Sequence, residues 1–312
     1  MHAEAATPAL HGARFLDPKV LARIGDIEII ARTVVEGFIG GLHHSPNVGL
    51  SVDFAEHRSY MPGDDIRRID WRLFGRTDRF HVKEFEADTN TDAIVLLDIS
   101  RSMDYGSGSV TKLDYGRYLA ACLAYLSRRQ RDRVGLVTFD SEVRNVVPPS
   151  AKHLPAVLHA IERIKAGGGG GWGGPGNLER PLSSIAENIR RRSILILISD
   201  LYEEPERVAV AVRKLHGRGS DLIVLHVLDN AELQFPFEDA ASFRDLESDE
   251  DLPVLPTELA ERYRELVGNH VAELRRQLED SRIDYALFDT SQPLDHALFE
   301  YLARRQRLAR VR

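Results

Sequence analysis

The stretch Ala93-Ile-Val-Leu-Leu97, followed directly by Asp98-Ile-Ser-Arg-Ser102, decides the fold predicted for this chain. An unbroken apolar run of this length is typical of a parallel strand that is buried on both faces of a sheet. Such a strand brings one carboxylate and two hydroxyls into the loop beyond its carboxyl end. Because ligands bind at this edge of open α/β sheets, we expect a binding site at Asp98, Ser100 and Ser102.

Three oxygen donors within five residues suit Mg²⁺ or Mn²⁺, which prefer oxygen ligands. The pattern D-x-S-x-S resembles the metal-ion-dependent adhesion site of von Willebrand factor A domains, which bind proteins through the metal and usually do no chemistry. The alternative is that Asp98, Ser100 and Ser102 only cap the helix that follows.

Strands and helices alternate from about residue 92 onward, which predicts crossover connections and a mostly parallel sheet with helices on both faces. The predicted strands are Ala93–Leu97, Val134–Phe139, a shorter edge strand Val143–Val147, Ile194–Ile198, Leu222–Leu228 and Tyr285–Phe288. The predicted helices are Lys112–Arg129, Leu154–Ile164, Leu178–Arg191, Pro205–His216, Thr257–Leu278 and Leu294–Arg304. The fold class is therefore α/β, of the Rossmann type.

A second carboxylate strengthens the prediction of a metal site. Asp200 follows the apolar strand Ile194–Ile198 much as Asp98 follows its own strand. If the two strands are neighbours, both acids project from one edge of the sheet, and their repulsion requires a cation. A metal ion would supply it, and so would the guanidinium of Arg101.

A longer motif gives a more specific resemblance. The segment Arg58-Ser-Tyr-Met-Pro-Gly-Asp-Asp-Ile-Arg-Arg-Ile-Asp-Trp71, then Val82-Lys-Glu-Phe-Glu86, Asp98–Ser102 and Thr290-Ser-Gln-Pro-Leu-Asp295 resemble, in order and spacing, the bacterial domain-of-unknown-function family fifty-eight. The resemblance covers roughly residues 15 to 305. Members of this family resemble von Willebrand A domains and are often encoded beside MoxR-type AAA+ ATPases. The resemblance therefore implies a protein-interaction module, an adaptor or substrate selector for such an ATPase.

The chain departs from the von Willebrand A pattern at one ligand. Those sites add a threonine from a later loop, whereas the corresponding turn here is Gly174-Pro-Gly-Asn-Leu178, with Gly176 at the threonine position. Asn177 is a possible extra ligand through its carbonyl oxygen, and water is the alternative. Because Mg²⁺ gives up its waters reluctantly, the loss of one protein ligand is expected to weaken its binding.

The predicted organisation has three parts: an N-terminal extension with the family signature (1–91), a von Willebrand A-like domain (92–305) and a basic tail (306–312). An acidic insertion at 229–251 has nine acidic residues and one arginine. We expect it to be a solvated, mobile loop, with a docking surface for a basic partner as the alternative. The alternating charges of the signature predict a salt-bridge network or, alternatively, a second partner surface.

The loop at 167–176 contains eight glycines around Trp172. It lacks the Lys-Ser/Thr of a nucleotide-binding loop, which favours a flexible rim of the site over a phosphate cradle. Trp172 is then either an anchor for a partner or a side chain folded back onto apolar surface.

Composition indicates a globular cytoplasmic protein. Hydrophobic residues make up 43% and charged residues 29%, and the net charge of -7 argues against nucleic acid as the partner. The single cysteine, Cys122, lies in an apolar run and is expected to be buried in a reducing compartment. The segment 1–15 does not resemble a signal peptide, and no stretch has the length of a membrane span.

Enzyme motifs are missing: the sequence has no G-x-S-x-G elbow, no H-E-x-x-H and no acid two residues after Asp98 for aspartyl-phosphate chemistry. We therefore predict a non-enzymatic protein-interaction module with a degenerate metal site formed by Asp98, Ser100, Ser102 and Asp200. Two alternatives stay open: a metal-dependent hydrolase that uses Asp98, and a structural scaffold without metal.

Overall fold

The computed structural model describes residues 17–43, 57–59, 74–76, 78–83, 91–165, 178–189, 191–216, 219–239, 241–244, 251–254, 256–294 and 298. Its main sheet has six strands: β3 (Asp92–Asp98), β4 (Arg133–Phe139), β5 (Val143–Ser150), β6 (Ser193–Ser199), β7 (Asp221–Leu228) and β10 (Asp284–Asp289). Their order is β10-β7-β6-β3-β4-β5. Neighbours run parallel except for β4 and β5, which are antiparallel.

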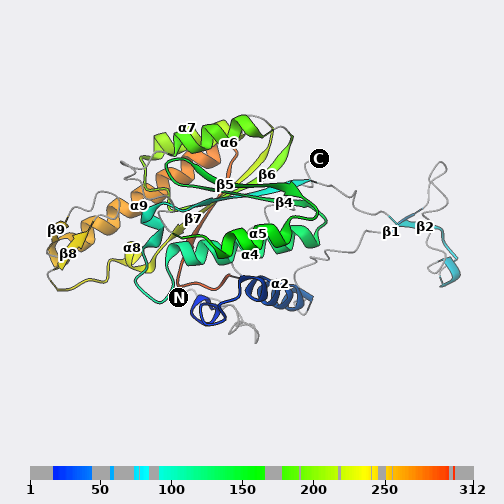
Figure 1. The fold of residues 1–312 in the computed structure, drawn as a ribbon, viewed down its shortest axis with the longest axis horizontal. Coiled ribbons are helices and arrows are strands. Elements are labelled where there is room, and N and C mark those ends of the chain that lie inside the picture. The colour runs from blue at the N-terminus through cyan, green and yellow to red at the C-terminus, as the bar shows by residue number, and fades with distance from the viewer. Residues whose placement is uncertain are drawn as a thin grey trace, which may run out of the picture.

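Helices cover both faces of this sheet (Figure 1). One face carries α2 (Ile27–His43), α4 (Lys112–Arg129) and α5 (Leu154–Glu162). The other carries α6 (Glu179–Asn188), α7 (Pro205–His216) and α9 (Pro256–Asp280). This arrangement confirms the predicted fold class, a Rossmann-type α/β fold with a mostly parallel sheet between two helical layers.

The predicted elements agree closely with the observed ones. The helices predicted over Lys112–Arg129 and Pro205–His216 have these bounds in the structure. The edge strand was predicted too short: β5 continues to Ser150 through two prolines, which an edge position tolerates. Of the helix predicted over Leu294–Arg304, only Leu294 and Leu298 are described, and both are helical.

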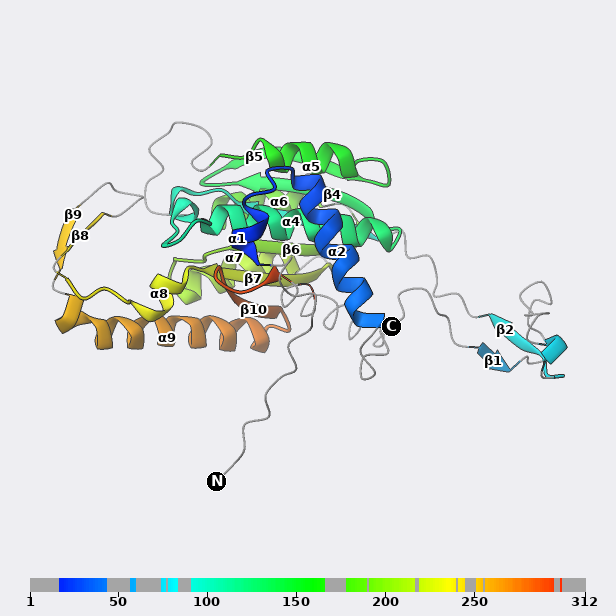
Figure 2. The ribbon, with the colours of Figure 1, turned by 90° about the horizontal axis from the view of Figure 1, so that it is seen from below.

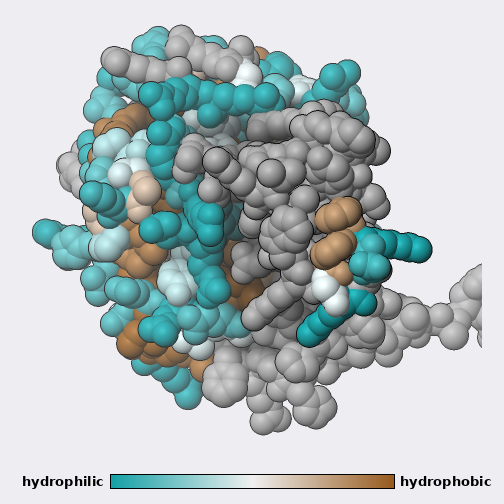
Figure 3. All heavy atoms as spheres, turned by 90° about the vertical axis from the view of Figure 1, so that its right-hand side faces the viewer, coloured by the Kyte–Doolittle hydropathy of each residue, from teal (hydrophilic) through white to brown (hydrophobic). Residues whose placement is uncertain are grey.

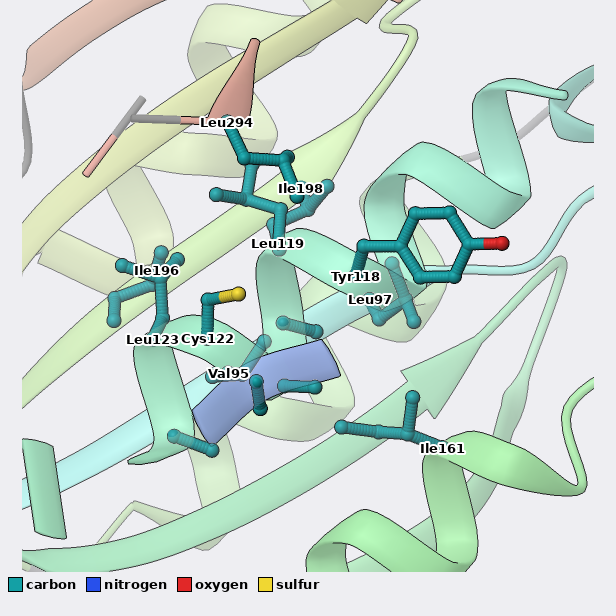
Figure 4. Packing of buried hydrophobic residues seen from close by; sticks show 14 of the residues in the cluster. Val95, Leu97, Tyr118, Leu119, Cys122, Leu123, Ile161, Ile196, Ile198 and Leu294 are labelled. Atoms are coloured by element: carbon teal, nitrogen blue, oxygen red, sulfur yellow. The ribbon is translucent and has the colours of Figure 1, made fainter. Parts of the chain in front are cut away.

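The larger core lies between the sheet and the α2, α4 and α5 layer. In Figure 4, side chains of α4 point at side chains of β3 and β6. The α4 residues in this contact are Leu119, Cys122 and Leu123, and the strand residues are Val95, Leu97, Ile196 and Ile198. Cys122 is fully buried, as predicted, and burial raises the pKa of its thiol.

The N-terminal extension contributes to this core. α1 (Pro18–Leu21) is capped by Asp17, whose Oδ1 accepts a hydrogen bond from the backbone N of Lys19 at 2.8 Å. α2 then packs on α4 and buries Ile30, Val34 and Phe38. This helix was not predicted from the sequence.

A short antiparallel hairpin, β1 (His57–Ser59) with β2 (His81–Lys83), includes the start of the family signature. The rest of the signature up to Trp71 lies outside the described residues, so its predicted salt-bridge network stays a prediction. The same holds for the glycine-rich loop with Trp172 and for the basic tail.

The acidic insertion is more ordered than predicted. It contains α8 (Asn230–Gln234) and β8 (Ala241–Arg244), and its last residue begins β9 (Asp251–Val254), which pairs antiparallel with β8. Figure 2 shows this hairpin beside the beginning of α9, away from the sheet. Phe235 contacts Tyr263 of α9 and Phe243 of β8, with ring centroids 4.5 and 5.6 Å apart. The prediction of a loop was therefore wrong for 230–234, 241–244 and 251, which belong to a helix or a strand, whereas 235–239 lack regular structure and include exposed residues. Aromatic residues between the acids form a cluster beside α9.

At one end of the molecule, hydrophilic side chains surround smaller hydrophobic areas (Figure 3). In the part of the chain that the structure describes, no helix combines the length and apolar character that crossing a membrane requires.

Candidate functional site

Asp98 ends β3 and is almost fully buried, with a relative exposure of 3%. Its two carboxylate oxygens have different partners. Oδ1 accepts a hydrogen bond from the backbone N of Ser100 at 2.9 Å, and Oδ2 accepts one from the hydroxyl of Ser199 at 2.6 Å. The first bond turns the chain immediately after the strand, and the second joins β3 to β6.

The two serines of the motif lie side by side. The chain after Asp98 forms a short 3-10 helix, η3 (Arg101–Asp104), and the hydroxyls of Ser100 and Ser102 are 3.0 Å apart. Ser100 precedes η3 but makes no side-chain capping bond, and α4 is capped instead by Thr111. The alternative that the serines are there to cap a helix is therefore not supported.

Asp200 follows β6 directly and is also buried, with a relative exposure of 3%. Because β3 and β6 are parallel neighbours with Leu97 opposite Ile198, the two acids emerge at one edge of the sheet, as predicted. The next residue, Leu201, has a φ of 47°. This left-handed conformation is unfavourable for leucine, so surrounding contacts must stabilise the turn.

Two histidines hold this turn in place. The Nε2 atom of His226 on β7 is 2.8 Å from the carbonyl oxygen of Asp200, and the Nε2 atom of His270 on α9 is 3.1 Å from that of Leu201. His226 also hydrogen-bonds through Nδ1 to the hydroxyl of Tyr285 at 2.7 Å. A neutral His226 that donates through Nε2 and accepts at Nδ1 satisfies both contacts.

The cation beside Asp200 is an ammonium. Lys112, the first residue of α4, places its Nζ 2.8 Å from Oδ2 of Asp200 and 2.8 Å from Oε1 of Glu232 on α8. Its side chain is completely buried, and its Nζ lies 4.4 Å from the centroid of the Tyr202 ring. Burial lowers the pKa of Lys112, but attraction to both carboxylates outweighs it and raises the pKa above its ordinary value.

Glu232 is held in turn by the beginning of α8. Its Oε2 accepts a hydrogen bond from the backbone N of Asp229 at 2.8 Å, while Asp229 caps α8 through Ala231. Asp229 also accepts bonds from the backbone N of Ser107 and the hydroxyl of Thr290, at 3.1 and 3.0 Å. The acidic insertion is thereby joined to the edge of the sheet where Asp98 and Asp200 lie.

The hydrogen bonds that hold the Asp98 carboxylate come from neutral groups, the backbone N of Ser100 and the hydroxyl of Ser199. Burial, and then repulsion by Asp200, raise its pKa from 3.8 to about 7, although hydrogen bonds from Ser199 and Ser100 lower it. The two carboxylates and two hydroxyls at this edge are oxygen donors of the kind that Mg²⁺ and Mn²⁺ prefer. Among the described residues, no group of three or more His, Cys, Asp or Glu side chains is arranged to hold a metal ion. A raised carboxylate pKa is also what a cation site displays before it receives the positive charge of its ion.

The raised pKa predicts the effect of Asp98→Asn on stability in metal-free buffer. The folded protein binds the Asp98 proton more tightly than the unfolded chain, so the contribution of this group to stability falls as the pH rises from about 4 to about 7. The asparagine side chain of the variant stays neutral throughout. We expect the variant to gain on the order of 2 kcal/mol relative to the parent between pH 5 and pH 8.

Urea unfolding of both proteins at the two pH values, with a chelator present, measures this gain. A constant difference between parent and variant would show that Asp98 is ionised throughout and that its pKa is not raised.

The structure brings Asp98, Ser100, Ser102 and Asp200 to one edge of the sheet, whereas Asn177 and Gly176 lie outside the described residues. The sequence suggested a metal ion or Arg101 as the cation near the two acids, and the structure pairs Asp200 with Lys112. Sequence reasoning missed Lys112, Glu232, Ser199 and His226. The sequence does contain a feature that points to Ser199 as a site residue, since it precedes Asp200 at the end of a strand. The feature that points to Lys112 is weaker: it is a cation in the first turn of a helix, where cations are unfavourable.

The histidine nearest to Asp200 does not have the properties of a general base. His226, which contacts the turn at Asp200, is fully buried, both of its nitrogens have hydrogen-bond partners, and burial lowers its pKa to about 3. Such a side chain stays neutral and held in place, which does not suit a general base for a hydrolase.

Comparison with protein families gives one match that includes the whole candidate site. The family model described as "Protein of unknown function DUF58" matches residues 56–273. Among curated proteins, the uncharacterized protein Rv1480 of Mycobacterium tuberculosis (strain ATCC 25618 / H37Rv) is 26% identical over 234 residues, which is 74% of this chain and 72% of that protein. The uncharacterized protein Mb1516 of Mycobacterium bovis gives the same values.

Three solved structures are similar over most of their own length. An aerotolerance-related membrane protein from Bacteroides fragilis has 16% identity and a TM-score of 0.48, covering 69% of this chain and 99% of that one. The protein BatB from Bacteroides thetaiotaomicron has 16% identity and a TM-score of 0.44, covering 69% and 98%. The SpRpn10 VWA domain has 10% identity and a TM-score of 0.37, covering 67% and 93%.

Proposed function

We propose that this chain, which belongs to the DUF58 family of proteins of unknown function, is a non-enzymatic protein-interaction module. Its contact surface is the carboxyl edge of the main sheet around Asp98 and Asp200. The observation that supports this proposal is the position of two buried carboxylates, together with two partly exposed hydroxyls, at the edge where open α/β sheets bind their ligands.

The metal is the first part of the proposal. Asp98, Ser100, Ser102 and Asp200 would hold Mg²⁺ or Mn²⁺, with Asn177 as a possible extra ligand. When bound, the ion would supply positive charge and open coordination positions for a carboxylate of the partner. The hydroxyl pair at 3.0 Å and the raised pKa of Asp98 support this assignment.

The partner is the second part. The family resemblance implies an adaptor for a MoxR-type AAA+ ATPase, and we propose such an ATPase as the protein that this edge contacts. The net charge of -7 makes nucleic acid a poor partner. The cytosol is the proposed compartment, because the single cysteine is a buried thiol.

A metal-free structural scaffold is the second candidate function. The observation that favours it is the ion pair of Lys112 with Asp200, which already provides one of the predicted metal ligands with a cation at 2.8 Å. In that case the edge would serve to join α4, β6 and α8, and loss of Asp98 would leave every complex intact.

Co-purification from the native host distinguishes the two candidates. We expect the tagged parent to bring down a MoxR-type AAA+ ATPase and Asp98→Asn to lose it without losing its fold, as measured by thermal melting. Asp280→Asn is the matched control, because it makes the same chemical change at an exposed side chain at the end of α9. Retention of the ATPase by folded Asp98→Asn would contradict the interaction proposal and favour the scaffold.

A broad hydrolase screen on the same three proteins tests the non-enzymatic part. Metal-dependent turnover in the parent and in Asp280→Asn, with none in Asp98→Asn, would replace the proposed module by an enzyme.

A further inference from the structure

Lys112 is a buried cation at a place where the local backbone disfavours one. It is the first residue of α4, and the positive end of a helix dipole favours anions in the first turn. Its ammonium is nevertheless fully buried. The two carboxylates that contact it come from the turn after β6 and from α8, so long-range contacts account for its position.

The carboxylate of Asp200 has one observed partner, the ammonium of Lys112, and one proposed partner, the metal ion. Its Oδ2 is hydrogen-bonded to the ammonium of Lys112 at 2.8 Å, and the same carboxylate is one of the proposed metal ligands. A divalent ion on Asp200 would therefore share one carboxylate group with a buried ammonium. Like charges this close repel strongly where water is excluded.

Glu232 makes the ammonium difficult to displace. Its side chain is only 12% exposed and accepts a hydrogen bond from Nζ of Lys112, while the Tyr202 ring lies 4.4 Å from the same atom. If Lys112 left Asp200, it would lose one of two charge-assisted hydrogen bonds in a buried place. A divalent ion must overcome this cost in addition to its own dehydration.

We propose that Lys112 is the resident cation of this site: it competes with divalent metal for Asp200 and thereby keeps the affinity for Mg²⁺ and Mn²⁺ low. This inference rests on the proposed function, because it concerns the metal of the same edge. It makes Lys112 the residue that determines how much free metal the site needs.

The test measures metal binding rather than activity. Calorimetry with MgCl₂ and with MnCl₂ compares the parent with Lys112→Met, which keeps the length of the stem and removes the charge. We expect at least ten-fold tighter binding in the variant, and loss of that gain in Lys112→Met combined with Asp98→Asn. Lys214→Met on α7 is the control for general charge effects, because it removes an exposed lysine.

A second variant guards against failure to fold. Lys112→Met combined with Glu232→Gln removes the ammonium together with one of the two carboxylates that it neutralises. The same gain in metal affinity is expected in this double variant. Equal metal affinity in the parent and in both variants would overturn the inference. Binding to the parent tighter than to the variants would do so as well.

The outcome is distinguishable from failure of the proposed function. The affinity comparison uses the purified chain alone, whereas the proposed function is tested by capture of the ATPase. Capture that depends on Asp98, together with unchanged metal affinity in Lys112→Met, would overturn only the role of Lys112.

Discussion

Lys112→Met is expected to lower the free energy of unfolding by about 3–5 kcal/mol in metal-free buffer, because breaking a buried ion pair leaves uncompensated charge in the interior. The ammonium is fully buried and bound to Asp200 and Glu232, both at 2.8 Å. Removing it leaves two carboxylates without their cation near Asp98, whose pKa is already raised by burial and then by Asp200. Mg²⁺ at millimolar concentration should restore part of the loss, because a ligand of the folded state stabilises it.

Urea unfolding of the parent, Lys112→Met and Lys214→Met measures this effect. Lys214 pairs with Glu179 at the exposed surface, so its replacement should change the free energy of unfolding far less. A loss in Lys112→Met no larger than that in Lys214→Met would show that the buried ion pair is not the main support of this edge.

His226→Gln is expected to make the protein less sensitive to acid. Burial lowers the pKa of His226 from 6.5 to about 3. Between these pH values the histidine binds a proton in the unfolded chain but stays neutral in the folded protein. The contribution of His226 to the free energy of unfolding is present in full above pH 6.5 and is lost as the pH falls toward 3. Between pH 7 and pH 4.5 this one group should remove about 2.5 kcal/mol of stability from the parent.

Glutamine keeps a hydrogen-bond donor and an acceptor for Asp200 and Tyr285 but does not titrate. The measurement is the difference in unfolding free energy between parent and His226→Gln at pH 7 and at pH 4.5. A comparison of variants is needed because the raised pKa of Asp98 acts in the opposite direction over this range. An unchanged difference at the two pH values would mean that His226 accepts a proton in the folded protein.

The fold was predictable because its elements have strong local signals. The run Ala93–Leu97 is apolar at every position, and the observed strand β3 adds only one residue at each end. The helix over Lys112–Arg129 was predicted with its observed bounds, since its apolar positions recur at helical spacing. In the structure Thr111 caps its beginning.

The candidate site was predictable only in part. Asp98 and Asp200 each end an apolar strand, and this local feature suffices to place them at one edge once the strands pair. Lys112 has only a weak local signal, a cation in the first turn of a helix, because its partners lie 88 and 120 residues further along the chain. Contacts of that separation depend on the assembled sheet, which the spacing of apolar residues does not specify.

The acidic insertion shows how composition misled the prediction. Its charge suggested a solvated loop, but Phe235, Phe237 and Phe243 lie between the acids and pack on one another, and Phe235 also packs on Tyr263. Contacts among these aromatic side chains place part of the insertion against α9, which its charge pattern did not indicate.

Photo-crosslinking beside the site tests the central claim most directly. A photoreactive residue at Tyr202, which is 51% exposed and next to Lys112, reports any protein that covers this edge in the native host. Val146 on β5, 55% exposed, is the control position. We predict crosslinks from position 202 to the AAA+ ATPase that disappear in Asp98→Asn, and none to it from position 146. Crosslinking to the ATPase that is unchanged by Asp98→Asn, or that occurs from position 146 alone, would contradict the claim that this edge is the contact surface.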